Sequence, residues 1–195
     1  MILTKDLRKV ISERRKIYEW FDGRLVPSSI VLIRDMLKSI DDIHDRNDLL
    51  GELAGEYLRA ELEDEYLLVE RERLANHPDE AIMWIGLAHA LSRRSDGAAE
   101  AKQSVIKGVE ISREVGALIR YSLTCQAQIA LEIGDPVLFG DALKDLILDS
   151  PNFREEDCWL DESLLRGLPD GFCDPNLLND YKKALEKRRD DDALE

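Results

Sequence analysis

The stretch AIMWIGLAHAL at residues 81–91 decides the fold. It is the longest largely apolar stretch of the chain, yet it is far shorter than the roughly 20 residues that cross a bilayer. We therefore expect no membrane-spanning helix here. The stretch is interpreted as the first helix of a repeated helix pair, because its residue pattern recurs on either side of it.

A 34-residue repeat passes through this stretch. Its four marker positions hold Trp84, Leu87, Ala88 and Leu91, and 34 residues earlier they hold Leu50, Leu53, Ala54 and Tyr57. A third unit follows at a spacing of 37 residues, with Tyr121 in the position of Trp84, and ends at Pro151. An alignment from Pro151 instead puts Leu123 in that position, so two registers that differ by two residues remain open.

The marker positions fit the W-x2-L-G-x2-Y pattern of a tetratricopeptide helix, and Pro78 stands at the proline that ends a unit. Residues 47–153 thus resemble the tetratricopeptide-repeat family. The resemblance implies an all-α fold, a TPR-like α-α superhelix in which antiparallel helix pairs form a right-handed stack. In such a stack the first helices line a concave groove and the second helices form the convex back.

The sequence on either side of the repeats predicts further helices. One helix is expected to run to Phe21 and to stop at Asp22-Gly23, and a second carries an aliphatic stripe from Ile30 to Ile43. Asp174-Pro175 is expected to open a closing helix. The expected single helical domain, 1–189, comprises an N-terminal helix pair at 1–46, three repeats at 47–153, and a C-terminal segment with a capping helix at 154–189, before a disordered tail at 190–195.

The resemblance also implies which residues face the groove, namely the second, fifth, ninth and twelfth of each unit. The candidate partner-binding residues are Gly51, Gly55, Leu58, Ile82, Ile85, His89, Ile119, Ser122, Gln126 and Ile129. This lining is small and apolar and lacks the Lys, Arg and Asn with which family members hold a terminal carboxylate. We expect it to bind an apolar or amphipathic segment of a partner protein. Alternatively, one of the chain's own terminal helices fills the groove.

The charge pattern restricts the class of partner. A formal net charge of −14 argues against nucleic-acid binding and makes basic proteins the natural electrostatic partners. An alternative function is therefore that of an acidic immunity or antitoxin-type inhibitor, which captures a basic toxin or nuclease through its surface. Residues 1–24 are an exception, with seven basic and four acidic side chains.

The residues that carry chemistry form no recognisable motif. The sequence has no glycine-rich phosphate loop, no H-E-x-x-H and no G-x-S-x-G, and Cys125, Cys158 and Cys173 include no C-x-x-C pair. We expect no catalytic residue, metal or cofactor. A small-molecule site would have only His89 and Gln126 as polar candidates. The sequence therefore predicts a non-catalytic, cytoplasmic interaction protein of adaptor or chaperone-like type, either a monomer or a homodimer, that acts on neither nucleic acid nor membrane.

Overall fold

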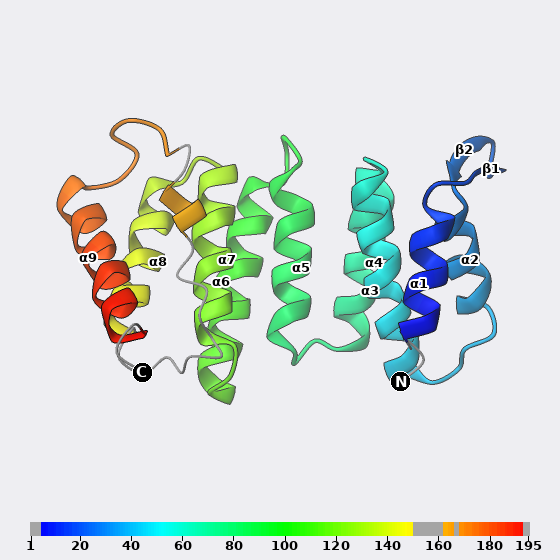
Figure 1. Ribbon diagram of the computed structural model, residues 1–195, viewed down its shortest axis with the longest axis horizontal. Coiled ribbons are helices and arrows are strands. Elements are labelled where there is room, and N and C mark those ends of the chain that lie inside the picture. Colours follow the sequence, from blue (N-terminus) through cyan, green and yellow to red (C-terminus); the bar gives the residue numbers. More distant parts are fainter. Residues whose placement is uncertain (1–4, 150–161, 166–167, 193–195) are drawn as a thin grey trace. The chain divides into compact units, whose positions relative to one another are not determined.

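The computed structural model describes residues 5–149, 162–165 and 168–192 (Figure 1). Within these residues the fold is all-α apart from one short hairpin. Contacts between residues divide the chain into two compact units, Met1–Pro78 (unit 1) and Asp79–Glu195 (unit 2). The boundary falls between the first and second predicted repeats, and the single domain expected from the sequence stays a prediction.

Unit 1 is a layer of helices with a hairpin inserted after the first of them. The elements are α1 (Lys5–Arg14), β1 (Tyr18–Phe21), β2 (Arg24–Pro27), α2 (Ser28–Leu37), α3 (Ile43–Arg59) and α4 (Glu63–Asn76). The helix α3 packs against both α2 and α4, and α1 packs against α2. The fully buried apolar side chains are Ile11, Ile30, Ile33, Leu49 and Leu50.

The hairpin replaces the second half of the first predicted helix. Asp22 and Gly23 have φ values of 50° and 79°, so both central residues of a two-residue turn are left-handed. This backbone matches the right-handed twist of the flanking strands, and Asp-Gly is among the strongest sequence signals for it. The prediction of a helix running to Phe21 was wrong, because Asp22-Gly23 makes a hairpin turn and does not end a helix.

The boundary between α2 and α3 also differs from the expectation. The helix α2 ends at Leu37, and Ile43 belongs to α3. The carboxylate of Asp42 accepts hydrogen bonds from the backbone N–H groups of His44 and Asp45, at 3.0 and 2.9 Å, and so caps α3. These bonds, chiefly the one from Asp45, lower the pKa of Asp42. The aliphatic stripe predicted from Ile30 to Ile43 is therefore divided between two helices, and Asp42 begins the second of them.

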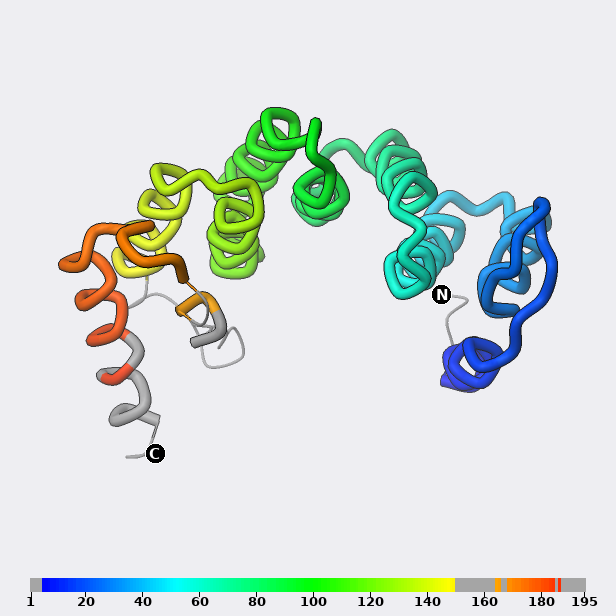
Figure 2. Tube along the Cα trace, turned by 90° about the horizontal axis from the view of Figure 1, so that it is seen from above, coloured from blue at the N-terminus to red at the C-terminus, as the bar shows by residue number. Residues whose placement is uncertain are grey.

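Unit 2 is a succession of antiparallel helices. Its elements are α5 (Ala81–Ser92), α6 (Ala98–Val115), α7 (Ile119–Glu132), α8 (Pro136–Asp149), the 3-10 helix η3 (Glu162–Leu165) and α9 (Pro175–Asp192). Each of α5 to α8 contacts the next long helix, and α5 also contacts α7. Figure 2 shows α5 and α7 in one row, with α6 and α8 in the row behind them.

The C-terminal helix closes unit 2. The helix α9 packs on α8, as expected of a closing helix, and Leu177 lies 3.7 Å from where a Cβ on Gly140 would stand. The helix continues to Asp192, so the first three residues of the predicted disordered tail are helical, whereas 193–195 lie outside the described residues. An amphipathic segment expected around Trp159 also lies outside them.

The helices α5 and α6 approach closely at Gly108. A Cβ at this position would stand 2.9 Å from Cγ1 of Ile85 and 3.2 Å from the carbonyl oxygen of Ala81. The core continues into α7, where Cys125 is buried. Burial raises the pKa of the Cys125 thiol to about 11, although a hydrogen bond with Tyr121 opposes the shift. The thiol is therefore protonated at neutral pH and acts as a packing residue.

Candidate partner-binding face

Four of the predicted groove residues lie between helices. Ile85, Ser122, Gln126 and Ile129 are all buried. The hydroxyl of Ser122 shares a hydrogen bond of 2.5 Å with that of Ser112 on α6, and Nε2 of Gln126 donates to the carbonyl oxygen of Leu138 on α8 at 3.5 Å. These four side chains pack the helices together, which corrects the lining predicted at their positions.

The register of the third repeat explains most of this difference. The less buried residues of α7 include Tyr121, Gln128 and Leu131, whose spacing of seven and ten residues puts them on one helix face. If the third repeat starts at Arg120, two residues later than Leu118, these three residues are the second, ninth and twelfth of the unit and so are expected to face the groove. In this register Leu123 is the residue equivalent to Trp84, and it is fully buried. Ile119, the remaining prediction on α7, is half-buried.

The matching face of α5 carries Ile82, His89 and Arg93, again spaced by seven and eleven residues. Ile82 and His89 were predicted from the sequence. A carboxylate of α7 joins the two helices, because the single hydroxyl proton of Ser92 is shared between Oε2 of Glu132 and the carbonyl oxygen of His89. We call this surface the α5–α7 face, defined by Ile82, His89, Arg93, Tyr121, Gln128 and Glu132.

His89 is a residue of the α5–α7 face whose pKa is shifted by its surroundings. Burial lowers its pKa below 6.5, the carboxylate of Glu132 opposes this shift, and the positive charge of Arg93 adds to it. The imidazole is therefore neutral at pH 7, and it can donate one hydrogen bond and accept another. His89 is thus a neutral polar group on a surface that is apolar at Ile82 and Tyr121.

Acidification is expected to destabilise the protein through His89. Because the pKa of His89 is lower in the folded than in the unfolded chain, the unfolded chain binds more protons below pH 6.5. The free energy of unfolding should therefore fall as the pH drops from 6.5 through the folded pKa, and His89→Gln should make this fall shallower. Urea unfolding of both proteins across that range measures the slope. Equal slopes would contradict the prediction.

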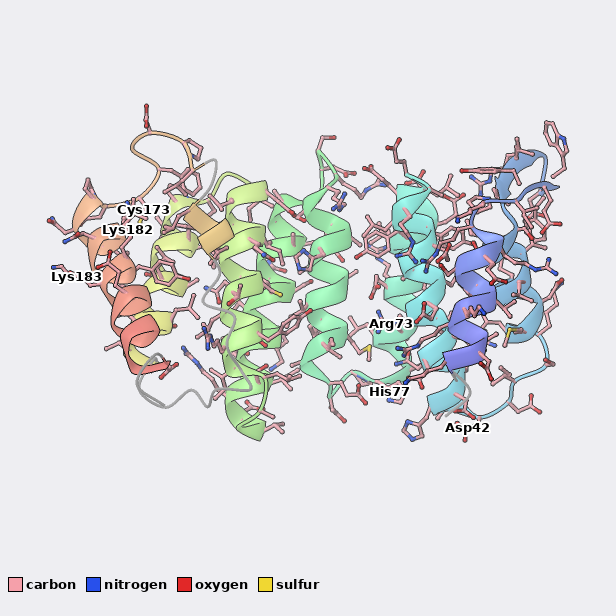
Figure 3. All side chains as sticks on the ribbon, in the orientation of Figure 1. Asp42, Arg73, His77, Cys173, Lys182 and Lys183 are labelled. Atoms are coloured by element: carbon pink, nitrogen blue, oxygen red, sulfur yellow. The ribbon has the colours of Figure 1, made fainter. Side chains whose placement is uncertain are left out.

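Two of the groove residues predicted in unit 1, Gly51 and Gly55, lie beside arginine side chains of the chain itself. A Cβ on Gly51 would stand 3.4 Å from the guanidinium of Arg73, and one on Gly55 would stand 3.2 Å from that of Arg59. Arg73 lies on α4 (Figure 3) and forms an ion pair of 2.9 Å with Glu70. Leu58 is half-buried. The two glycines thus leave room for arginine side chains and not for the backbone of a ligand.

The first helix of the chain is tied to the same helix, α3. Arg8 pairs with Glu52 at 3.7 Å, and Arg15, just after α1, pairs with Glu56 at 2.6 Å. In unit 1 this favours the alternative that a terminal helix of the chain occupies the predicted groove. In unit 2 the terminal helix α9 lies on α8, but η3 packs on α7, on the side away from α6 (Figure 2).

Glu56, whose side chain is 1% exposed, was not predicted from the sequence to have a special role. Its carboxylate accepts hydrogen bonds from Arg15 at 2.6 Å, Arg59 at 2.5 Å and Ser29 at 2.7 Å. Burial alone would raise the pKa of Glu56, but these donors outweigh it and the pKa is lowered. The sequence holds one indication of this role, because Glu56 lies on the same helix face as Leu53, where an apolar residue is expected.

Unit 2 also has a surface depression that is not lined by the residues of the α5–α7 face. A depression of about 300 Å³ lies beside Ala98 and Gly134, and its charged groups, Lys102 and Asp135, pair with each other at 2.6 Å. Among the described residues no group of three or more His, Cys, Asp or Glu side chains could hold a metal ion. In the same part of the chain no helix is long and apolar enough to cross a membrane.

Comparisons with protein-family models, with curated proteins and with solved structures find no match to this chain.

Proposed function

We propose that the chain is a non-catalytic protein-interaction module of adaptor or chaperone-like type, built as a TPR-like stack of helix pairs. One observation carries the proposal. On the α5–α7 face, Ile82 and Tyr121 are 38% and 42% exposed, although most other residues of both helices are buried. We place the protein in the cytoplasm, where the buried thiols of Cys125 and Cys173 stay reduced.

The side chains of the α5–α7 face indicate what kind of ligand would bind there. An aliphatic and an aromatic side chain supply apolar area, while the neutral His89, the amide of Gln128 and the carboxylate of Glu132 supply hydrogen-bonding groups beside it. An amphipathic helix fits such a surface, because it presents an apolar stripe and polar flanks together. Large apolar side chains at the centre of such an interface contribute most of its affinity.

The test is capture of proteins from a native lysate by three immobilised baits. They are the wild-type protein, Ile82→Asp, and Val137→Asp as a control that removes an apolar residue 68% exposed on α8. We expect wild type and control to retain a common partner at low and high salt. Ile82→Asp should lose it at least tenfold, because an aspartate on the face would be buried without a partner. Circular dichroism checks that all three baits are folded.

Two outcomes would count against the α5–α7 face. Equal retention by all three baits would place the contact elsewhere on the chain. A partner that all three lose together at high salt would favour the acidic inhibitor, because screening by salt weakens contacts between exposed charges. The net charge of −14 is the feature behind that second function.

A further inference from the structure

The hairpin of unit 1 has one apolar face that nothing in the described chain covers. Tyr18 and Trp20 alternate with inward residues on β1, and Leu25 lies opposite Trp20 on β2. These three side chains are 59%, 76% and 55% exposed. The opposite side of the hairpin is packed, with Val26 buried and Phe21 under the guanidinium of Arg34 at 4.6 Å. We call the exposed side the outer hairpin face.

The exposure of this face is large for so small an element. Its three side chains leave roughly 400 Å² of mostly apolar surface, taking 150–250 Å² for each when fully exposed. A contiguous patch of this size on a soluble protein typically marks an interaction site. Among the described residues β1 and β2 form the sheet by themselves, so neither of its edges pairs with a further strand there.

The charged side chains of residues 1–24 indicate what kind of molecule would bind the outer hairpin face. The formal excess of three positive charges in residues 1–24 is offset by acidic residues elsewhere in unit 1, because Arg8, Arg15 and Arg24 pair with Glu52, Glu56 and Glu65. Asp22, at the hairpin turn, pairs with Arg34. The other exposed cations of α1 and its end are interspersed with Asp6, Glu13 and Glu19, and they are Lys5, Lys9, Arg14 and Lys16. The surface is therefore nearly balanced in sign, with four cations against three acids outside these pairs.

Such a balance disfavours a ligand of one sign, such as a nucleic acid or an anionic membrane, and suits a copy of the same surface. A two-fold interface requires a patch that is complementary to itself, which an apolar centre with charges of both signs at its margin provides. Two copies of the outer hairpin face would bury roughly 800 Å² together, below the roughly 1,000 Å² that a stable specific interface exceeds. An interface of this size suits a weak, reversible dimer.

We propose that the outer hairpin face is a homodimer interface, in which Tyr18, Trp20 and Leu25 of one copy pack against the same residues of a second copy. This interface is separate from the α5–α7 face. Dimerisation therefore leaves capture of a partner through Ile82 intact, and the failure of either proposal leaves the other standing.

The test is sedimentation velocity of the purified full chain from low micromolar to high micromolar concentration. We expect wild type to pass from monomer to dimer over this range. Trp20→Glu and Leu25→Glu should each weaken the dimer at least tenfold, because the two-fold axis brings two added carboxylates together. The matched control is Leu148→Glu, which changes an apolar residue 72% exposed on α8 and should dimerise as wild type does.

Three results would overturn the proposal. The first is a wild-type protein that stays monomeric throughout, and the second is a dimer that both hairpin variants leave unchanged. The third is a monomer that binds anionic lipid vesicles through Trp20, which would assign the face to a membrane. All three variants change exposed side chains, so their thermal unfolding should match wild type and a loss of the dimer cannot be attributed to misfolding.

Discussion

Glu56→Ala is expected to lower the free energy of unfolding by roughly 3 kcal/mol, the lower end of the cost of breaking a buried ion pair. The substitution removes the acceptor of Arg15, Arg59 and Ser29 together. It leaves the buried hydroxyl of Ser29 without this bond and opens a space between α2 and α3. The lower end applies because Arg15 and Arg59 are 34% and 49% exposed and can turn to water.

The control for this prediction is Glu52→Ala, one helical turn earlier on α3. Glu52 pairs only loosely with Arg8, at 3.7 Å, and its side chain is 23% exposed, so about 0–1 kcal/mol is expected. Urea unfolding followed by circular dichroism measures both variants at pH 7. If Glu56→Ala costs no more than Glu52→Ala, the carboxylate does not hold α1, α2 and α3 together.

The same carboxylate should also set part of the response to acid. Its pKa is lowered in the folded chain relative to 4.5, so its stabilising contribution is complete above pH 4.5 and is lost as the pH falls through the folded pKa. In wild type the free energy of unfolding should therefore decline below pH 4.5. Glu56→Gln, which retains the shape of the side chain but not its charge, should show a smaller decline.

The sequence predicted the helices of unit 2 well because each of them is long and has an uninterrupted apolar pattern. Trp84 and its marker positions place α5, and Pro175 places the first turn of α9. In unit 1 the helix predicted from the same kind of pattern was wrong over residues 15–21. A spacing of three and four residues in Ile17, Tyr18 and Phe21 imitates a helix, while the backbone follows the turn chemistry of Asp22-Gly23.

The candidate site was harder to predict than the fold, since a shift of two residues in a helix changes which face is turned to the groove. Counting from Leu118 selects Ser122 and Gln126, which face α6 and α8, whereas counting from Arg120 selects Tyr121 and Gln128. Pro151 carried the information for the second register. Contacts such as Glu56 with Arg15, 41 residues apart, leave no periodic trace in a sequence.

Gly97→Ala is expected to cost about 3 kcal/mol, the upper end of the cost of overpacking. A Cβ at Gly97 would stand 2.1 Å from the carbonyl oxygen of Leu91 and 2.9 Å from its carbonyl carbon, and backbone atoms cannot rotate away as a side chain can. The turn between α5 and α6 must therefore open. Its hydrogen bond from the Gly97 N–H to the carbonyl of Arg94, now 3.1 Å, should lengthen.

A second glycine separates this steric effect from backbone strain. Gly97 has an ordinary helical φ of −91°, so its alanine variant suffers from the clash alone, whereas Gly134 has a φ of +71° with nothing within 4 Å of a Cβ. Gly134→Ala should cost only about 1 kcal/mol, the penalty of a left-handed alanine. Both values come from urea unfolding at pH 7. Because Gly97 sets the position of α5, its variant should also weaken capture through Ile82, while Gly134→Ala should retain it. Similar costs and similar capture for the two variants would show that the close turn at Gly97 does not position the α5–α7 face.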